Sequence, residues 1–238
     1  MPLQCVILAG GLGTRMRPRT AAVPKALLPV LGEPFADWQL RLLARCGIER
    51  VVYCVGYRGD QLRAHVGDGA RYGLRVAWVD EGRRLLGTAG ALRLALDRGA
   101  LDEAFFVLYG DSYLPVDVAA VEAAWARSGL PALMTVLRNE GRWDRSNCVY
   151  RDGRVVLYDK GRPDDRRAEM AWIDYGLSVL SRAVIAERVP PGAVADLADV
   201  QRDLSSAGQL AGMEVRERFY EAGSPEGLRE LEAYLSRA

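Results

Sequence analysis

The chain has 238 residues, of which 50% are hydrophobic and 26% charged, a composition that supports a folded domain with a sizeable core. Its 32 Lys and Arg residues nearly balance its 31 Asp and Glu residues, and the net charge of +1 argues against a nucleic-acid partner. No apolar run approaches the roughly 20 residues of a membrane span, and the N-terminus lacks the basic start of a signal peptide, so we expect a cytoplasmic protein without a membrane partner.

Short apolar runs alternate with helical periodicity over the first 108 residues. We predict strands at 3–9, 50–55, 74–79 and 104–108, with helices at 37–46, 60–66 and 89–96 between them. This alternation predicts a parallel sheet covered by helices on both faces. Glycines or acids follow each strand, at the edge where open α/β sheets bind ligands.

The second half of the chain shows a different pattern, with strands and turns after a helix at 118–127. We predict strands at 132–137, 147–151, 155–158 and 170–180, the last interrupted by Gly176. Asp152-Gly153 predicts a tight hairpin, and Ser224 is expected to cap a final helix at 225–235. Four cysteines without C-x-x-C spacing predict reduced thiols, and the single His65 cannot supply a multi-histidine metal site.

The segment after the first strand concentrates glycines and cations. Gly10, Gly11 and Gly13 lack Cβ atoms, so backbone N–H groups can close around an anion, while Arg15, two further arginines and Lys25 add positive charge. The glycine spacing does not match a dinucleotide fingerprint or a Walker loop. This loop therefore predicts a binding site for a triphosphate, whose spread charge needs many donors.

The pattern Gly-Gly-x-Gly-Thr-Arg, followed by Pro-Lys, resembles the signature loop of the sugar-1-phosphate nucleotidylyltransferases, and the likeness continues through residues 27–34, 87–91, 110–111 and 221–225. The resemblance implies a Rossmann-like α/β fold, the nucleotide-diphospho-sugar transferase fold, with a mixed, mostly parallel central sheet flanked by helices. It also implies a single domain over residues 1–238, with a nucleotide-binding half at about 1–115 and a sugar-binding half at about 116–238. The oligomeric state expected is a monomer or small homo-oligomer.

The resemblance also implies roles for individual residues. The catalytic residues would be Arg15, Lys25 and Asp111. The nucleotide would contact Leu8, Ala9, Gly10, Gly11, Gly13, Thr14, Arg15, Glu81, Gly87 and Thr88. The sugar phosphate would contact Lys25, Asn147, Lys160, Asp174 and Tyr175. Asp111 and Glu221 would hold Mg²⁺, although Glu221 stands where the family usually has an aspartate.

The implied substrates are a nucleoside triphosphate and a sugar 1-phosphate, and overall resemblance favours GTP with a manno-configured hexose or heptose. Two alternatives stay open. Trp143, Trp172 and Tyr175 are compatible with an aromatic cage for phosphocholine in a cytidylyltransferase. The departure at Glu221 is compatible with a non-catalytic regulatory protein that binds nucleotide sugars.

Overall fold

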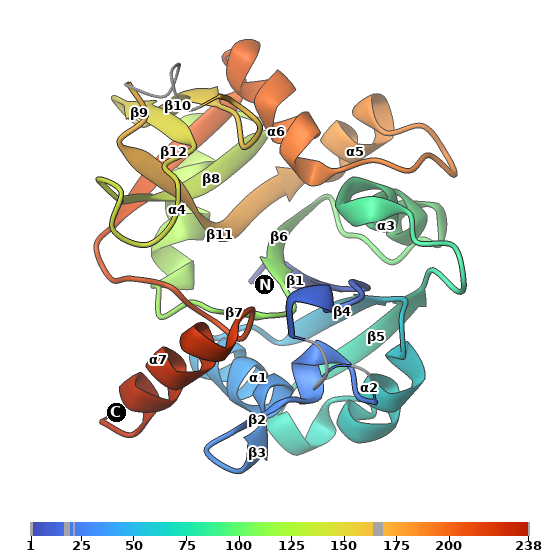
Figure 1. Cartoon of the computed structure of the whole chain (residues 1–238). Helices are drawn as coiled ribbons and strands as arrows, with labels where there is room; N and C mark the ends of the chain where they lie inside the picture. The colour runs from blue at the N-terminus through green and yellow to red at the C-terminus, as the bar shows by residue number, and fades with distance from the viewer. Residues whose placement is uncertain (1, 17–19, 21, 164–168, 238) are drawn as a thin grey trace.

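The computed structural model describes residues 2–16, 20, 22–163 and 169–237, with the backbone alone at Arg15. Nine strands form one central sheet in the order β5-β4-β1-β6-β11-β8-β12-β10-β9 (Figure 1). The first four, β5 (Arg75–Asp80), β4 (Arg50–Val55), β1 (Gln4–Ala9) and β6 (Ala104–Tyr109), are all parallel. Helices α1 (Phe35–Arg45), α2 (Gly59–Val66) and α3 (Gly87–Asp97) connect them, so the predicted elements of this half are confirmed to within two residues at most ends.

Most strand pairs in the second half of the sheet are antiparallel, so the mixed sheet as a whole is less parallel than the mostly parallel sheet expected. Strand β11 (Trp172–Ser181) runs antiparallel to both β6 and β8 (Ala132–Arg138), and β12 (Leu210–Val215) runs parallel to β8. Strands β10 (Arg154–Tyr158) and β9 (Cys148–Arg151) complete the sheet as an antiparallel hairpin. Asp152 and Gly153 have φ values of 48° and 76° at its tip, which confirms the predicted tight turn.

Among the described residues of this half, four regular elements were not predicted: α5 (Arg182–Arg188), α6 (Leu197–Ser206), β12 and the short strand β13 (Tyr220–Glu221). Strand β12 contains Gly212, a residue that weakens a strand signal. A Cβ at Gly212 would lie 2.6 Å from the ring of Tyr150, so the glycine is required by packing between strands. Helix α4 (Val118–Ser128) was predicted.

Both faces of the sheet are buried. Residues of α1, α2 and α4 form a core on one face, and residues of α3, α5 and α6 form a core on the other. The four cysteines are free, as predicted. Among the described residues, no helix has the length and apolar character needed to cross a membrane.

The C-terminal segment returns to the first half of the molecule, where α7 (Pro225–Leu235) lies beside α1 (Figure 1). Ser224 caps α7 as predicted, accepting a hydrogen bond from the Gly227 N–H at 3.0 Å. Leu228, Leu231 and Leu235 of α7 pack in a third core with Phe35 and its neighbours. The short strand β13 (Tyr220–Glu221), just before α7, pairs with β7 (Ser112–Tyr113). Residues 220–235 thus pack with the half that we expected to bind the nucleotide, although the functional division near residue 115 stays a prediction.

Candidate functional site

A cavity of about 330 Å³ opens at the carboxyl ends of β1 and β6. Its lining comprises Leu8, Ala9, Gly10, Gly11, Gly13, Thr14, Lys25, Ala26, Cys54, Glu81, Leu85, Gly87, Thr88, Ala91, Tyr109, Gly110 and Asp111. All the residues expected to contact a nucleotide line this cavity except Arg15, whose side chain lies outside the described residues together with Arg17 and Arg19. The structure therefore gathers the predicted set in one place, while the role of each residue stays a prediction.

The three glycines of the loop differ in whether the surrounding structure requires glycine at their positions. A Cβ at Gly10 would lie 2.4 Å from Glu81 Oε1, so this glycine makes room for the acid. Gly13 has a φ of 60°, which favours glycine, and its carbonyl accepts hydrogen bonds from Thr20 Oγ1 at 2.8 Å and from the Met16 N–H at 3.0 Å. Gly11 has open space around it, because no atom lies within 4 Å of the position that a Cβ would take. Only Gly11 of the three therefore has no packing explanation among the described residues.

Glu81 holds the loop that follows β5. Its Oε2 accepts a hydrogen bond from the Leu86 N–H at 2.6 Å. Burial raises the pKa of the Glu81 carboxyl above its ordinary value, and the Leu86 hydrogen bond opposes this effect. Glu81 thus fixes the path of residues 81–86 beside the cavity.

Gly87 and Thr88 lie in the first turn of α3, against the segment that leads into α6. Gly87 has a φ of 74°, and a Cβ there would lie 2.4 Å from the Ala195 carbonyl oxygen. Thr88 Oγ1 donates to Asp196 Oδ1 at 2.9 Å and accepts from the Leu197 N–H at 2.7 Å. Both residues line the cavity, but these contacts give them a packing role that the sequence motif did not reveal.

Asp111 and Lys25, which both line the cavity, form an ion pair through Lys25 Nζ and Asp111 Oδ2. The side chain of Lys25 is 16% exposed and that of Asp111 is 24% exposed, so neither side chain is fully buried. Asp111 follows β6, as predicted, and Lys25 begins the short helix η3 (Lys25–Leu27). Each of these two charges thus compensates the other.

Glu221 is brought beside Asp111 by the pairing of β13 with β7. It lies opposite Ser112, and the Ala222 N–H donates to the Asp111 carbonyl at 2.7 Å. In the part of the chain that the structure describes, no group of three or more His, Cys, Asp or Glu side chains is arranged so that it could hold a metal ion. Two carboxylates on neighbouring segments fit Mg²⁺, which takes one or two protein carboxylates and completes its shell with phosphate oxygens and water.

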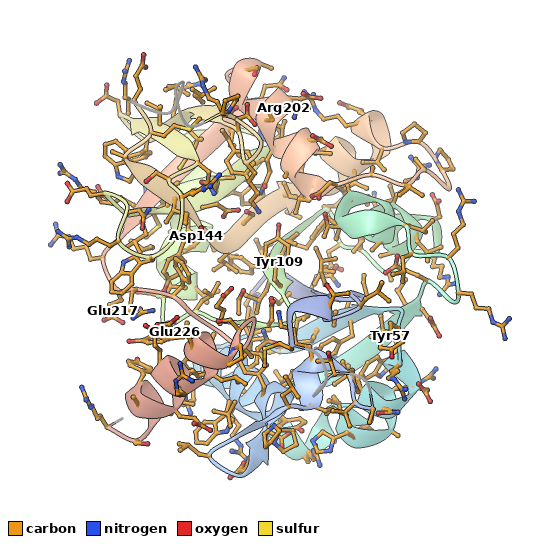
Figure 2. All side chains as sticks on the ribbon, in the orientation of Figure 1. Tyr57, Tyr109, Asp144, Arg202, Glu217 and Glu226 are labelled. Carbon is orange, nitrogen blue, oxygen red and sulfur yellow. The ribbon has the colours of Figure 1, made fainter. Side chains whose placement is uncertain are left out.

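On the other side of the site, Asn147, Lys160 and Asp174 come together as predicted for a sugar-phosphate site. The buried Asn147 accepts a hydrogen bond from the Asp174 N–H at 2.9 Å. Asp174 Oδ2 accepts from the Tyr158 hydroxyl at 3.3 Å and lies 3.7 Å from Lys160 Nζ. Lys160 Nζ is also 5.5 Å from the ring centroid of Tyr109, a cavity residue near the centre of the molecule (Figure 2). Tyr109 therefore joins the nucleotide cavity to the Asn147–Lys160–Asp174 group.

The side chain of Tyr175 does not join this group. It is 2% exposed and packs in the core edge-to-face against Phe219, with ring centroids 6.0 Å apart. Trp172 packs with the core on the opposite face of the sheet. Trp143 stacks on the Arg218 guanidinium, with the guanidinium carbon 3.8 Å from the ring centroid. These three aromatic side chains therefore do not form the cage that a choline headgroup requires.

Several lining residues were not predicted, namely Ala26, Cys54, Leu85, Ala91, Tyr109 and Gly110. Tyr109 carried a usable signal, because it directly precedes Gly110-Asp111 at the end of a predicted strand. Burial raises the pKa of its hydroxyl, with the nearby acids Asp174, Asp196 and Asp111 adding to the shift, so Tyr109 stays protonated at neutral pH.

Comparison with known proteins gives relatives that act on different nucleotides. The chain is 33% identical over 192 residues to a mannose-1-phosphate guanylyltransferase of Mycobacterium tuberculosis, covering 80% of this chain and 52% of that protein. It is 27% identical over 207 residues to a UTP–glucose-1-phosphate uridylyltransferase of Synechocystis sp., covering 82% of this chain and 53% of that protein. The chain thus spans about half the length of these curated relatives.

Solved structures share the fold. HddC from Yersinia pseudotuberculosis complexed with GMP-PN superposes with a TM-score of 0.79 at 22% identity, covering 98% of this chain and 99% of that chain. A UTP-bound UGPase from Acinetobacter baumannii gives a TM-score of 0.76 at 16% identity, covering 99% of this chain and 93% of that chain. These likenesses confirm the predicted nucleotide-diphospho-sugar transferase fold. Residues 5–213 match the MobA-like NTP transferase domain, and the chain belongs to that family.

Proposed function

We propose that this protein transfers a nucleotidyl group from a nucleoside triphosphate to a sugar 1-phosphate, producing a nucleoside-diphosphate sugar and pyrophosphate. The observation that carries the proposal is the position of the Lys25–Asp111 pair, which lines the glycine-loop cavity together with Tyr109. Beyond Tyr109 lies the Asn147–Lys160–Asp174 group. A nucleotide in the cavity and a sugar phosphate at this group would meet at Lys25 and Asp111.

The reaction needs no general base, since the attacking sugar-phosphate oxygen is already an anion. That oxygen forms a bond to the α-phosphorus, and the bond from the α-phosphorus to the bridging oxygen breaks to release pyrophosphate. The main barrier that a protein can lower is repulsion between the two phosphates, together with their alignment. A lysine at the junction and glycine amides around the triphosphate address both requirements.

Lys25 is proposed to move from Asp111 to the phosphates when these bind. The ammonium would then screen the approaching sugar phosphate from the α-phosphate. Arg15, whose backbone lies in the 3-10 helix η1 (Thr14–Met16), is proposed to contact the triphosphate. Lys160 would hold the sugar phosphate, and its ion pair with the buried carboxylate of Asp174 keeps the ammonium oriented.

Asp111 and Glu221 are proposed to hold Mg²⁺ with the help of phosphate oxygens. When bound, the cation would neutralise charge on the phosphates. Asp174 is proposed to accept from a sugar hydroxyl. Tyr175 contributes at most its backbone, because its side chain lies in the core.

For the base and sugar we propose GTP and a manno-configured hexose or heptose 1-phosphate. The support is the similarity to a mannose-1-phosphate guanylyltransferase, while other relatives named above use UTP. The test is a matrix of five nucleoside triphosphates against a panel of sugar 1-phosphates, with pyrophosphate release as the readout. Turnover with one pair is expected to exceed the others, and Lys25→Ala serves as the inactive control. Binding of a nucleotide sugar without any turnover would instead support a regulatory protein.

A further inference from the structure

Gln39 is a buried amide in the middle of α1, with 1% of its surface exposed. Its Nε2 group donates one hydrogen bond to the Tyr109 carbonyl at 2.9 Å and another to the Ser112 carbonyl at 2.7 Å. These two carbonyls stand on either side of Gly110 and Asp111. Both hydrogens of one side-chain amide are therefore used to bracket the turn that carries Asp111.

The backbone of the same turn is fixed at two further points. The Gly110 N–H donates to the Leu8 carbonyl at 2.9 Å, and the Asp111 carbonyl accepts from the Ala222 N–H at 2.7 Å. A Cβ at Gly110 would lie 2.8 Å from Ala9 Cβ, so the turn packs directly on β1. Among these contacts, only those of Gln39 come from a side chain.

Stability alone does not explain a glutamine at this position. Its Oε1 is buried and makes no hydrogen bond among the described residues. A buried amide oxygen without a partner lowers stability, whereas the amide nitrogen supplies a donor that the Tyr109 and Ser112 carbonyls would lose with an apolar side chain. What glutamine adds here is an amide NH₂ group that donates to two backbone carbonyls at once.

We propose that Gln39 is a positioning residue for the candidate metal ligand Asp111, a role that rests on the proposed function. It does not touch the substrates. By fixing the carbonyls of Tyr109 and Ser112, it holds the Asp111 carboxylate where Lys25 and Mg²⁺ meet it, and it holds Ser112 where β7 pairs with Glu221. Groups that orient metal ligands typically change metal affinity or activity by about 10- to 100-fold when removed.

Gln201 provides a matched control on the other side of the sheet. It is also 1% exposed, its Oε1 also has no partner among the described residues, and its Nε2 donates to Ser178 Oγ at 2.9 Å. Gln201→Met and Gln39→Met thus remove the same buried amide with the same replacement. Gln201 lies in α6, which packs on the face of the sheet opposite to α1.

The test compares these variants by urea unfolding, by steady-state kinetics and by Mn²⁺ binding. Mn²⁺ is titrated in the presence of a non-hydrolysable nucleoside triphosphate, and free Mn²⁺ is followed by electron paramagnetic resonance. We expect Gln39→Met to lose at least as much stability as Gln201→Met, because it removes two hydrogen bonds rather than one, whereas only Gln39→Met loses about 10-fold or more in Mn²⁺ affinity and in kcat. Gln39→Asn, which keeps an amide but withdraws it by one bond, is the second variant if Gln39→Met does not fold, and it should also bind Mn²⁺ more weakly.

The outcomes separate this inference from the proposed function. If a folded Gln39 variant matches Gln201→Met in Mn²⁺ affinity and kcat, Gln39 does not position Asp111. If the wild-type protein does not bind Mn²⁺, the inference fails with the metal site. If the wild type binds Mn²⁺ but never turns over, while Gln39→Met binds Mn²⁺ weakly, the positioning role stands and the proposed function fails.

Discussion

Gly11→Ala is the substitution that tests the phosphate-binding loop most directly, because Gly11 has no packing role among the described residues. No atom lies within 4 Å of a Cβ built at this position, and Gly11 is not among the residues with positive φ. Alanine therefore fits without strain. The free energy of unfolding should stay unchanged or rise by about 0.4–1 kcal/mol, since alanine restricts the unfolded chain.

Nucleotide binding should respond differently. A methyl group at Gly11 would stand in the open space through which phosphate oxygens reach the backbone amide. Losing one hydrogen bond to a charged group costs about 1.5–3 kcal/mol, which corresponds to an increase of about 10- to 150-fold in the dissociation constant of the triphosphate. Calorimetric titration with a nucleoside triphosphate and Mg²⁺ measures this change.

Gly13→Ala is the contrasting variant. Gly13 has a φ of 60°, and its Cβ would lie 3.1 Å from Thr20 Cγ2, so alanine here should lower the free energy of unfolding by about 1–2 kcal/mol. The two variants thus separate loss of fold from loss of binding. Triphosphate binding by Gly11→Ala with wild-type affinity would refute the idea that the loop closes around phosphates.

Three other predictions concern charged residues at the site. Lys25→Ala should lower kcat/KM by at least about 100-fold with an unchanged circular dichroism spectrum, because it removes a transition-state charge partner; near-wild-type kinetics would contradict this role. If Glu221 binds Mg²⁺, Glu221→Asp should keep partial activity in a Mg²⁺ titration and Glu221→Gln should lose most of it, whereas equal, near-wild-type rates would leave Asp111 as the protein ligand. Burial raises the pKa of the Glu81 carboxyl above its ordinary value of 4.5, because the charged form is less favourable in the folded protein than in the unfolded chain. The free energy of unfolding should therefore fall as the pH rises through that raised pKa. Urea unfolding across this range should show a weaker decline for Glu81→Gln, and identical pH slopes would argue against the shift.

The cavity was predictable because its residues directly follow predicted strands in the sequence and because these strands lie in a regular parallel sheet. Glycines and acids follow β1, β5 and β6, and the carboxyl ends of parallel strands meet at one edge of a sheet. The sequence therefore sufficed to bring Gly10, Glu81 and Asp111 together. It placed Gly87 there as well, but it did not reveal why that residue is glycine, because a Cβ at Gly87 would lie 2.4 Å from the carbonyl oxygen of Ala195, about a hundred residues away.

Asp174 and Tyr175 show how a local rule limits such predictions. Successive side chains of a strand point to opposite faces, so two adjacent residues rarely reach the same ligand through their side chains. Asp174 faces Lys160 and Tyr158, and Tyr175 accordingly enters the core beside Phe219. Strand periodicity alone would have separated the two.

Glu221 reaches the site by a route that no local pattern indicates. After β12 the chain crosses back to the first half of the molecule, and Arg218 anchors this crossing between the rings of Trp143 and Tyr220, at 3.8 and 4.7 Å, with an ion pair to Glu230 at 2.8 Å. Figure 2 shows Glu217 and Glu226, which flank this segment, below Asp144. Trp143 belongs to residues 139–147, which end at the proposed sugar-site residue Asn147. Tyr220 directly precedes Glu221, the second candidate ligand for Mg²⁺. The contacts of Arg218 with these two rings therefore connect the two segments. Glu221 thus lies beside Asp111 because β13 and β7 pair although they are more than seventy residues apart, and for this reason the position of Glu221 follows from the fold rather than from the motif.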